Sequence, residues 1–157
     1  GNVKWFLKVF KLRLGDMYKQ EWSSTVFERD RYKLYAKFKS VLHVESYLSS
    51  IDIYCFRVAL TQFRLGVLPI NNNLKRFSAI LESRYCIFCK NEAEDEHHFL
   101  LCCPLYFDLR KRFIGNMCVY SVSTILSFSD SKRCRLISKF IFHAIKRRQL
   151  HAEALTC

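Results

Sequence analysis

A cluster of cysteine and histidine residues near the middle of the chain restricts the fold more than any other feature. Cys86 and Cys89 are separated by two residues, and the doublets His97-His98 and Cys102-Cys103 follow. Two thiols in a short loop, followed within about fifteen residues by an imidazole and another thiol, have the spacing of a tetrahedral Cys3His zinc site. We therefore predict a small zinc knuckle, with Zn²⁺ as cofactor.

The two doublets leave two sets of ligands open, since His97 and Cys102 have the same spacing as His98 and Cys103. A residue before proline is disfavoured in the helical region, so Pro104 should place Cys103 at the end of a short helix, where its side chain can turn back. The favoured ligands are Cys86, Cys89, His98 and Cys103. The alternatives are packed free thiols and a disulfide framework, which fits poorly with a chain that shows no secretory signal.

Glycine and proline are scarce, which indicates helices. The 157 residues include four glycines and two prolines, and half of the residues are hydrophobic. So few turn residues favour helices joined by short loops, and the length suits one domain. We expect an all-α, irregular helical domain with an embedded zinc knuckle. No apolar run approaches the roughly 20 residues of a membrane span, so we expect an intracellular protein, nuclear or cytoplasmic, with no membrane partner.

The net charge of +12 is unevenly distributed. Residues 1–50 carry ten Lys or Arg and five Asp or Glu, residues 51–106 carry six of each, and residues 107–157 carry ten and three. This division predicts a basic helical region over 1–66, a neutral linker and knuckle over 67–106, and a second basic helical region over 107–157, together forming one cooperative unit. Such a charge favours RNA or DNA as partner, although solvated basic faces are the simpler alternative.

Apolar spacing predicts where the helices lie. Gly15 is expected to end a first helix that buries Trp5, Val9 and Leu12, and Gly66 to end another with a left-handed residue. The expected helices cover residues 5–14, 17–27, 29–42, 53–63, 105–113 and 124–128, with a short one from Glu94 and an irregular connection over 67–84. A last helix, capped within Ser129-Asp130-Ser131, should bury Leu136, Ile137, Phe140, Ile141 and Ala144.

Two groups of basic residues are candidate phosphate contacts. The members of the first group are spaced four residues apart along the predicted helix 29–42, which puts them on one edge of that helix. The second lies in the C-terminal region. The candidates are Arg29, Lys33 and Lys37, and then Arg110, Lys111, Arg112, Lys146, Arg147 and Arg148.

Several motifs together resemble a known family. They are Phe63-Arg64-Leu65-Gly66, Arg84-Tyr85-Cys86-Ile87-Phe88-Cys89, the run from Glu94 to Tyr106, and Leu109-Arg110, with weaker likeness at Gln20-Glu21-Trp22, 31–38 and 140–147. This pattern resembles the C-terminal zinc-knuckle region of animal non-LTR retrotransposon reverse transcriptases and covers most of the chain. In that family the histidine directly precedes a Phe-Leu pair and the last cysteine precedes proline, which implies His98 and Cys103 here. The doublets are departures from the family pattern.

The resemblance implies a nucleic-acid-associated accessory segment of a retroelement polyprotein, or a domesticated remnant of one. The rest of that polyprotein is then a possible partner, and Gly1 in place of methionine suggests a portion of something longer. Polymerisation needs paired aspartates for two metal ions, and the sequence contains no Asp-Asp pair. We expect a non-catalytic protein.

Two other classes of function compete with nucleic-acid binding. A zinc-stabilised helical domain could instead serve protein–protein interaction. A histidine-metal nuclease is the less favoured alternative, suggested by Glu96-His97-His98. Such an enzyme needs a further Asn or His soon afterwards, and the next histidine is His143.

Overall fold

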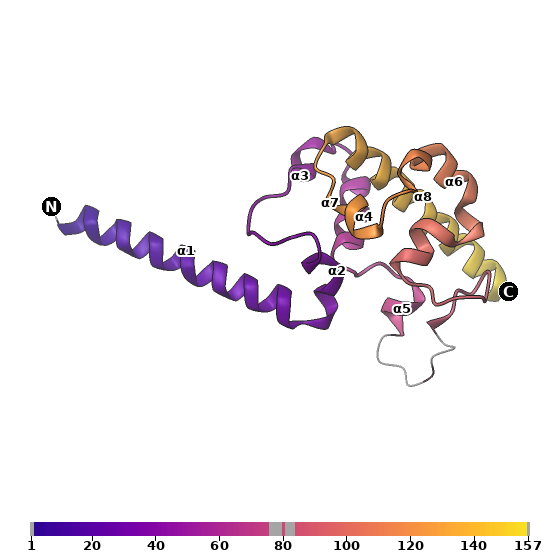
Figure 1. The fold of residues 1–157 in the computed structure, drawn as a ribbon, viewed down its shortest axis with the longest axis horizontal. Helices are drawn as coiled ribbons and strands as arrows, with labels where there is room; N and C mark the ends of the chain where they lie inside the picture. Colours follow the sequence, from indigo (N-terminus) through magenta and orange to yellow (C-terminus); the bar gives the residue numbers. More distant parts are fainter. Residues whose placement is uncertain (1, 76–79, 81–83, 157) are drawn as a thin grey trace.

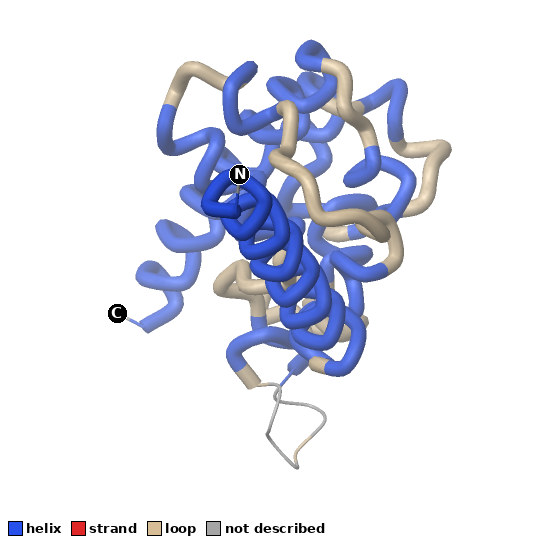
Figure 2. Tube along the Cα trace, turned by 90° about the vertical axis from the view of Figure 1, so that its left-hand side faces the viewer, coloured by secondary structure: helices blue, strands red, loops and turns tan. Residues whose placement is uncertain are grey.

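The fold is all-α, which confirms the prediction. The computed structural model describes residues 2–75, 80 and 84–156, and helices dominate that part of the chain (Figure 2). Its extended pairing consists of one isolated antiparallel bridge between Tyr85 and Ala93. None of the described helices combines the length and apolarity needed to cross a membrane.

The helical elements vary widely in length, from single turns to seven turns (Figure 1). The α-helices are α1 (Asn2–Glu28), α2 (Lys33–Ala36), α3 (Tyr47–Ser50), α4 (Tyr54–Arg64), α5 (Asn71–Leu74), α6 (Phe107–Phe113), α7 (Val122–Ser127) and α8 (Ser131–Thr156). Within the described residues, four short segments have other helical geometry: η1 (Asp30–Tyr32), η3 (His98–Cys102), η4 (Pro104–Tyr106) and η5 (Gly115–Met117). Of these, η3 is a π-helix.

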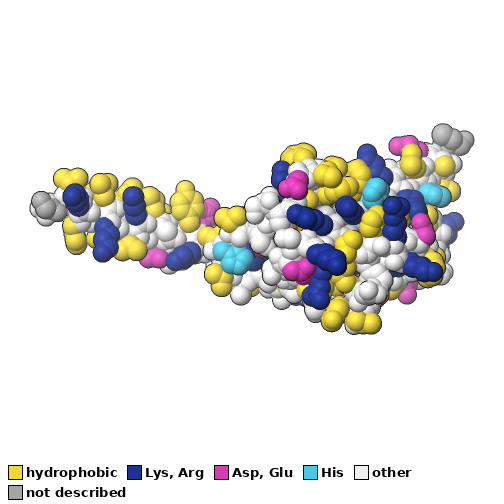
Figure 3. All heavy atoms as spheres, turned by 90° about the horizontal axis from the view of Figure 1, so that it is seen from above, with side chains coloured by type: hydrophobic (Ala, Val, Ile, Leu, Met, Phe, Trp, Pro, Cys, Tyr) yellow, Lys and Arg dark blue, Asp and Glu magenta, His cyan; other side chains and the backbone are white. Residues whose placement is uncertain are grey.

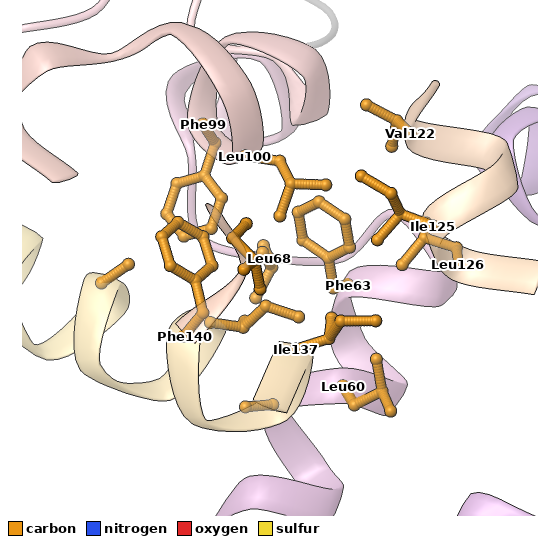
Figure 4. Close-up of a cluster of buried hydrophobic side chains, with 14 of the residues drawn as sticks. Leu60, Phe63, Leu68, Phe99, Leu100, Val122, Ile125, Leu126, Ile137 and Phe140 are labelled. Carbon is orange, nitrogen blue, oxygen red and sulfur yellow. The ribbon is translucent and has the colours of Figure 1, made fainter. Parts of the chain in front are cut away.

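The core forms where α4 packs against α8. Of the stripe predicted on α8, Ile137, Phe140, Ile141 and Ala144 are buried, and Leu136 is half-buried against them. Figure 4 shows Phe99 of η3 next to Phe140 of α8, and Leu60 and Phe63 of α4 on the side of Ile137. The Phe99 ring centroid lies 5.8 Å from that of Phe63 and 6.0 Å from that of Phe140. The buried cluster therefore joins residues from all three predicted regions.

Two helix ends follow the sequence signals. Gly66 has a φ of 65° just after α4, and a Cβ there would lie 3.2 Å from the Arg31 carbonyl oxygen. Both the left-handed backbone and the close approach favour glycine. Asp130 caps α8, because its carboxylate accepts a hydrogen bond of 2.9 Å from the Arg133 N–H.

The N-terminal helix differs from the prediction. Residues 2–28 form one continuous α1, so the predicted stop at Gly15 was wrong. A glycine within a helix costs only about 1 kcal/mol relative to alanine. Helix α1 projects away from the body (Figures 1 and 3), and Val26 is its one buried residue. Trp5 and Phe6 are 65% and 61% exposed, so the expected burial of this helix is also wrong.

The predicted helix over 29–42 is broken as well. Arg29 has extended backbone before η1, and regular helix ends with α2 at Ala36. Tertiary contacts compete with the helix here, because Lys39 turns inward and its Nζ lies 2.5 Å from Glu45 Oε1. The connection 67–84 contains the short helix α5, and residues 76–79 and 81–83 of that prediction lie outside the described residues.

Candidate metal centre

A tight hairpin positions the first two cysteines. The Cys86 N–H donates to the Glu92 carbonyl (2.9 Å), and the Glu94 N–H donates to the Arg84 carbonyl (2.8 Å). The turn closes when the Lys90 N–H donates to the Cys86 carbonyl (2.9 Å), with Lys90 at a left-handed φ of 56°. This local folding is what a two-residue spacing between thiols allows, since both side chains can face one point.

The second half of the cluster comes from the π-helix η3. Asp95 Oδ1 accepts a hydrogen bond of 2.8 Å from the His98 N–H at its start. The Cys103 N–H then donates to the His98 carbonyl (2.8 Å), across five residues. Cys103 leaves the helical region with a ψ of 122°, which the following Pro104 favours. Short π segments of this kind occur often at functional sites.

Cys86, Cys89 and His98 form a group that could hold a metal ion. Their ligand atoms all lie within 4.8 Å of one another. Cys89 Sγ is 3.3 Å from His98 Nε2, and the fully buried Cys103 Sγ is 3.8 Å from Cys86 Sγ. His97 and Cys102 lie apart from this group: both are exposed, and His97 Nδ1 is 3.4 Å from Cys102 Sγ.

These separations can be compared with those around a tetrahedral zinc ion. With Zn–S of about 2.3 Å and Zn–N of about 2.0 Å, two sulfurs lie about 3.8 Å apart, and a sulfur and a nitrogen about 3.5 Å apart. The Cys86–Cys103 separation of 3.8 Å and the Cys89–His98 separation of 3.3 Å are close to these values. The donor set of thiols and imidazole also fits zinc.

The surroundings orient the ligands and influence their charge. Glu92 Oε2 lies 3.2 Å from His98 Nδ1, which directs the other ring nitrogen, Nε2, toward Cys89. Hydrogen bonding from Cys103 lowers the pKa of the Cys86 thiol, and the N–H groups of Cys89 and Phe88 lower it further. The same contact with Cys86, together with burial, raises the pKa of Cys103. The sequence analysis did not identify Glu92 as the partner of a ligand, although its position three residues after Cys89 could have indicated that it lies near the site.

A buried ion pair attaches the hairpin to the C-terminal helix. Both Glu94 and Arg148 are buried, and the guanidinium of Arg148 binds the two carboxylate oxygens of Glu94. Arg148 also donates to Asn71 Oδ1 (2.9 Å), and the Asn71 N–H donates to Glu94 Oε2 (2.7 Å). Arg148 therefore lies inside the protein rather than on the expected phosphate-binding surface.

Arg110 is also buried, contrary to expectation. Its Nη2 donates to the carbonyl oxygen of Cys103, and the residue is only 7% exposed. Burial lowers the pKa of Arg110, while negative charge on Cys103, Cys118 and Cys102 would raise it. Arg110 therefore places a cation beside the backbone of Cys103.

The other predicted basic residues lie nearer the surface. Arg147 is half-buried and donates to Asp108 Oδ2 (2.8 Å). Lys33 is exposed and its Nζ lies 2.7 Å from Asp30 Oδ1. The remaining candidates are exposed: Arg29, Lys37, Lys111, Arg112 and Lys146. Since helix 29–42 is broken, Arg29, Lys33 and Lys37 do not share a helical edge.

Several basic residues lie on α6 and α8, which pack against each other. His143 stacks on Phe113, with ring centroids 5.6 Å apart and the rings 3° from parallel. Burial and the charges of Arg112 and Lys139 lower the pKa of His143, with a further contribution from Arg147. We call Arg112, Lys139, His143 and Lys146 the α6–α8 basic face. Lys139 was missing from the predicted contacts, although its spacing of seven residues from Lys146 could have indicated a shared face.

No family model, curated protein or solved structure matches this chain.

Proposed function

We propose that the chain is a non-catalytic zinc module that binds RNA or DNA mainly through phosphate contacts. The proposed ligands of Zn²⁺ are Cys86, Cys89, His98 and Cys103. The observation that carries the zinc site is the group of Cys86, Cys89 and His98, whose ligand atoms all lie within 4.8 Å of one another. Cys103 lies outside that group but has its Sγ 3.8 Å from Cys86 Sγ, which supports it as the fourth ligand. Bound zinc supplies no reaction step here, because four protein ligands complete its coordination and it stabilises the fold.

Metal analysis of purified variants tests the ligands. We expect Cys86→Ser and Cys103→Ser to lower the zinc content per chain. Cys102→Ser is the matched control, because it removes the adjacent thiol, which points elsewhere. An equal loss of zinc content in Cys102→Ser and Cys103→Ser would contradict the proposed ligand set.

The α6–α8 basic face is the proposed surface for the nucleic acid. Arg112 and Lys146 are exposed, and Lys139 is half-exposed beside them. Cations on a protein surface attract a phosphate backbone by releasing its counterions, which makes the affinity dependent on salt. Arg112 lies over the Phe113 ring and Lys146 over the Phe142 ring.

A salt titration tests this surface. Replacing Arg112, Lys139 and Lys146 by Gln should weaken binding to RNA and duplex DNA and reduce the slope of log K against log salt by about 2 to 3. The control replaces Arg29, Lys33 and Lys37 by Gln, which removes the same charge from the other predicted group. Equal effects of the two triple variants, or binding that is insensitive to salt, would contradict the proposal.

The same proposal includes the biological setting that the resemblance implies: an accessory segment of a retroelement protein, or a domesticated remnant, in the nucleus or cytoplasm. The second candidate function is protein–protein interaction, and the exposed apolar side chains of α1, such as Trp5 and Phe6, favour it. Wild-type protein that binds zinc but neither RNA nor DNA at low salt would favour this second function.

A further inference from the structure

Arg110 differs from the other buried cations in its partners. Lys39 and Arg64 are both paired with Glu45. Arg148 is paired with Glu94. Within the described residues, Arg110 has no carboxylate partner: its Nη2 donates to the Cys103 carbonyl, and its buried Nη1 has no hydrogen-bond partner.

A buried cation without a counter-charge is unfavourable, because the interior solvates charge poorly. The proposed zinc ligand that Arg110 contacts is Cys103, whose carbonyl oxygen accepts the hydrogen bond from Nη2. A thiol becomes a thiolate when it binds zinc. Three thiolates, a neutral imidazole and Zn²⁺ together carry a net charge of −1, whereas two thiolates and two imidazoles would give a neutral centre.

We propose that Arg110 is the counter-cation of the zinc–thiolate centre and positions Cys103 through its carbonyl oxygen. This inference rests on the proposed zinc site and deepens it. The negative zinc–thiolate centre would compensate the charge of the buried guanidinium. A Cys3His ligand set therefore fits this interior better than a ligand set that gives a neutral centre. It also links α6, which carries Arg110, to the knuckle.

The test compares three variants of the full chain. Arg110→Met removes the charge but keeps most of the volume, Arg110→Lys keeps the charge, and Arg112→Met removes an exposed charge from the same helix. Zinc affinity is measured by chelator competition, and the stability of the zinc-free protein by urea denaturation. We expect Arg110→Met to weaken zinc binding about tenfold or more, Arg110→Lys to restore part of it, and Arg112→Met to leave it within twofold.

The stability of the zinc-free protein shows whether Arg110 acts through its charge or only through packing. If Arg110 acts as a counter-cation, Arg110→Met should leave the zinc-free protein as stable as wild type or more stable, because it removes a buried charge. Loss of stability in both the zinc-free and the zinc-bound forms would overturn the inference, as would unchanged zinc affinity in Arg110→Met. Wild-type protein that fails to bind zinc would instead contradict the proposed site itself.

Discussion

Arg148 meets Glu94 through two short contacts: its Nε is 2.6 Å from Oε1 and its Nη2 is 2.6 Å from Oε2. Fifty-four residues separate the two along the chain. Such a two-point pairing is geometrically specific, and it joins the neutral knuckle to the basic C-terminal helix. The acidic run beside the cysteines therefore contributes an internal partner for α8.

Breaking the Glu94–Arg148 pair should lower the stability of the protein. Glu94 is 1% exposed, so Glu94→Gln leaves the Arg148 charge buried without a carboxylate, and we expect a loss of about 3 kcal/mol or more in the free energy of unfolding. Urea denaturation of the zinc-loaded protein measures it. Asp108→Asn is the control, because Asp108 also pairs with an arginine but is 66% exposed. A comparable loss in both variants would argue against the buried pair.

The exposed pair has its own pH dependence. The hydrogen bond from Arg147 lowers the pKa of Asp108 from 3.8 to about 2. Since the folded-state pKa lies below the unfolded one, any stabilisation from Asp108 is present above about pH 4 and is lost as the pH falls toward 2. A carboxyl NMR titration should show this low pKa in wild type and a value near 4 in Arg147→Met. Identical titration curves would contradict the contact.

Glu92 should tune zinc binding without holding the ion. Its carboxylate lies 3.2 Å from His98 Nδ1, and partners of a ligating imidazole typically contribute tenfold or more to metal affinity. We expect Glu92→Gln to weaken zinc binding by about tenfold, measured by chelator competition. The control Asp16→Asn removes an exposed carboxylate from α1 and should change nothing. If both variants bind zinc like wild type, the contact has no influence on the metal.

The turn after Cys89 carries local backbone strain that glycine should relieve. Lys90 has a φ of 56°, and this region costs a residue with a side chain about 1 kcal/mol or more. Because glycine also loses more entropy on folding, Lys90→Gly should stabilise the zinc-loaded protein by only about 0.5 kcal/mol. Lys90→Val should lower the melting temperature. A stabilising valine would show that position 90 adopts another backbone conformation.

The sequence predicted best those elements whose ends have a local cause. Gly66 ends α4 through its own left-handed backbone and a hydrogen bond from its N–H to the Phe63 carbonyl, and Asp130 caps α8 by accepting from the Arg133 N–H. The α8 stripe was also visible, because its spacing matches the helical period. Pro104 likewise anticipated the conformation of Cys103.

Most of the errors lie where a side chain finds a partner beyond one helical turn. A helix over 29–42 has suitable periodicity, but Lys39 reaches Glu45 and the chain leaves the helix. Arg110 and Arg148 look like surface cations in the sequence, because nothing within one helical turn of either residue shows that Cys103 or Glu94 will be its partner. At Gly15 the sequence predicted a helix end that the structure lacks, because a glycine without further stop signals did not end α1.

The packing around the cluster has a consequence for the release of a bound metal ion. His98 is buried and Phe99, the next residue, packs between Phe63 and Phe140 in the core. His98 and the fully buried Cys103 flank this packed ring, whereas Cys89 is only half-buried. Opening of the segment between Asp95 and Tyr106 should therefore speed the release of a bound ion, so that a variant that loosens the packing of Phe99 would lose zinc to a chelator faster than wild type.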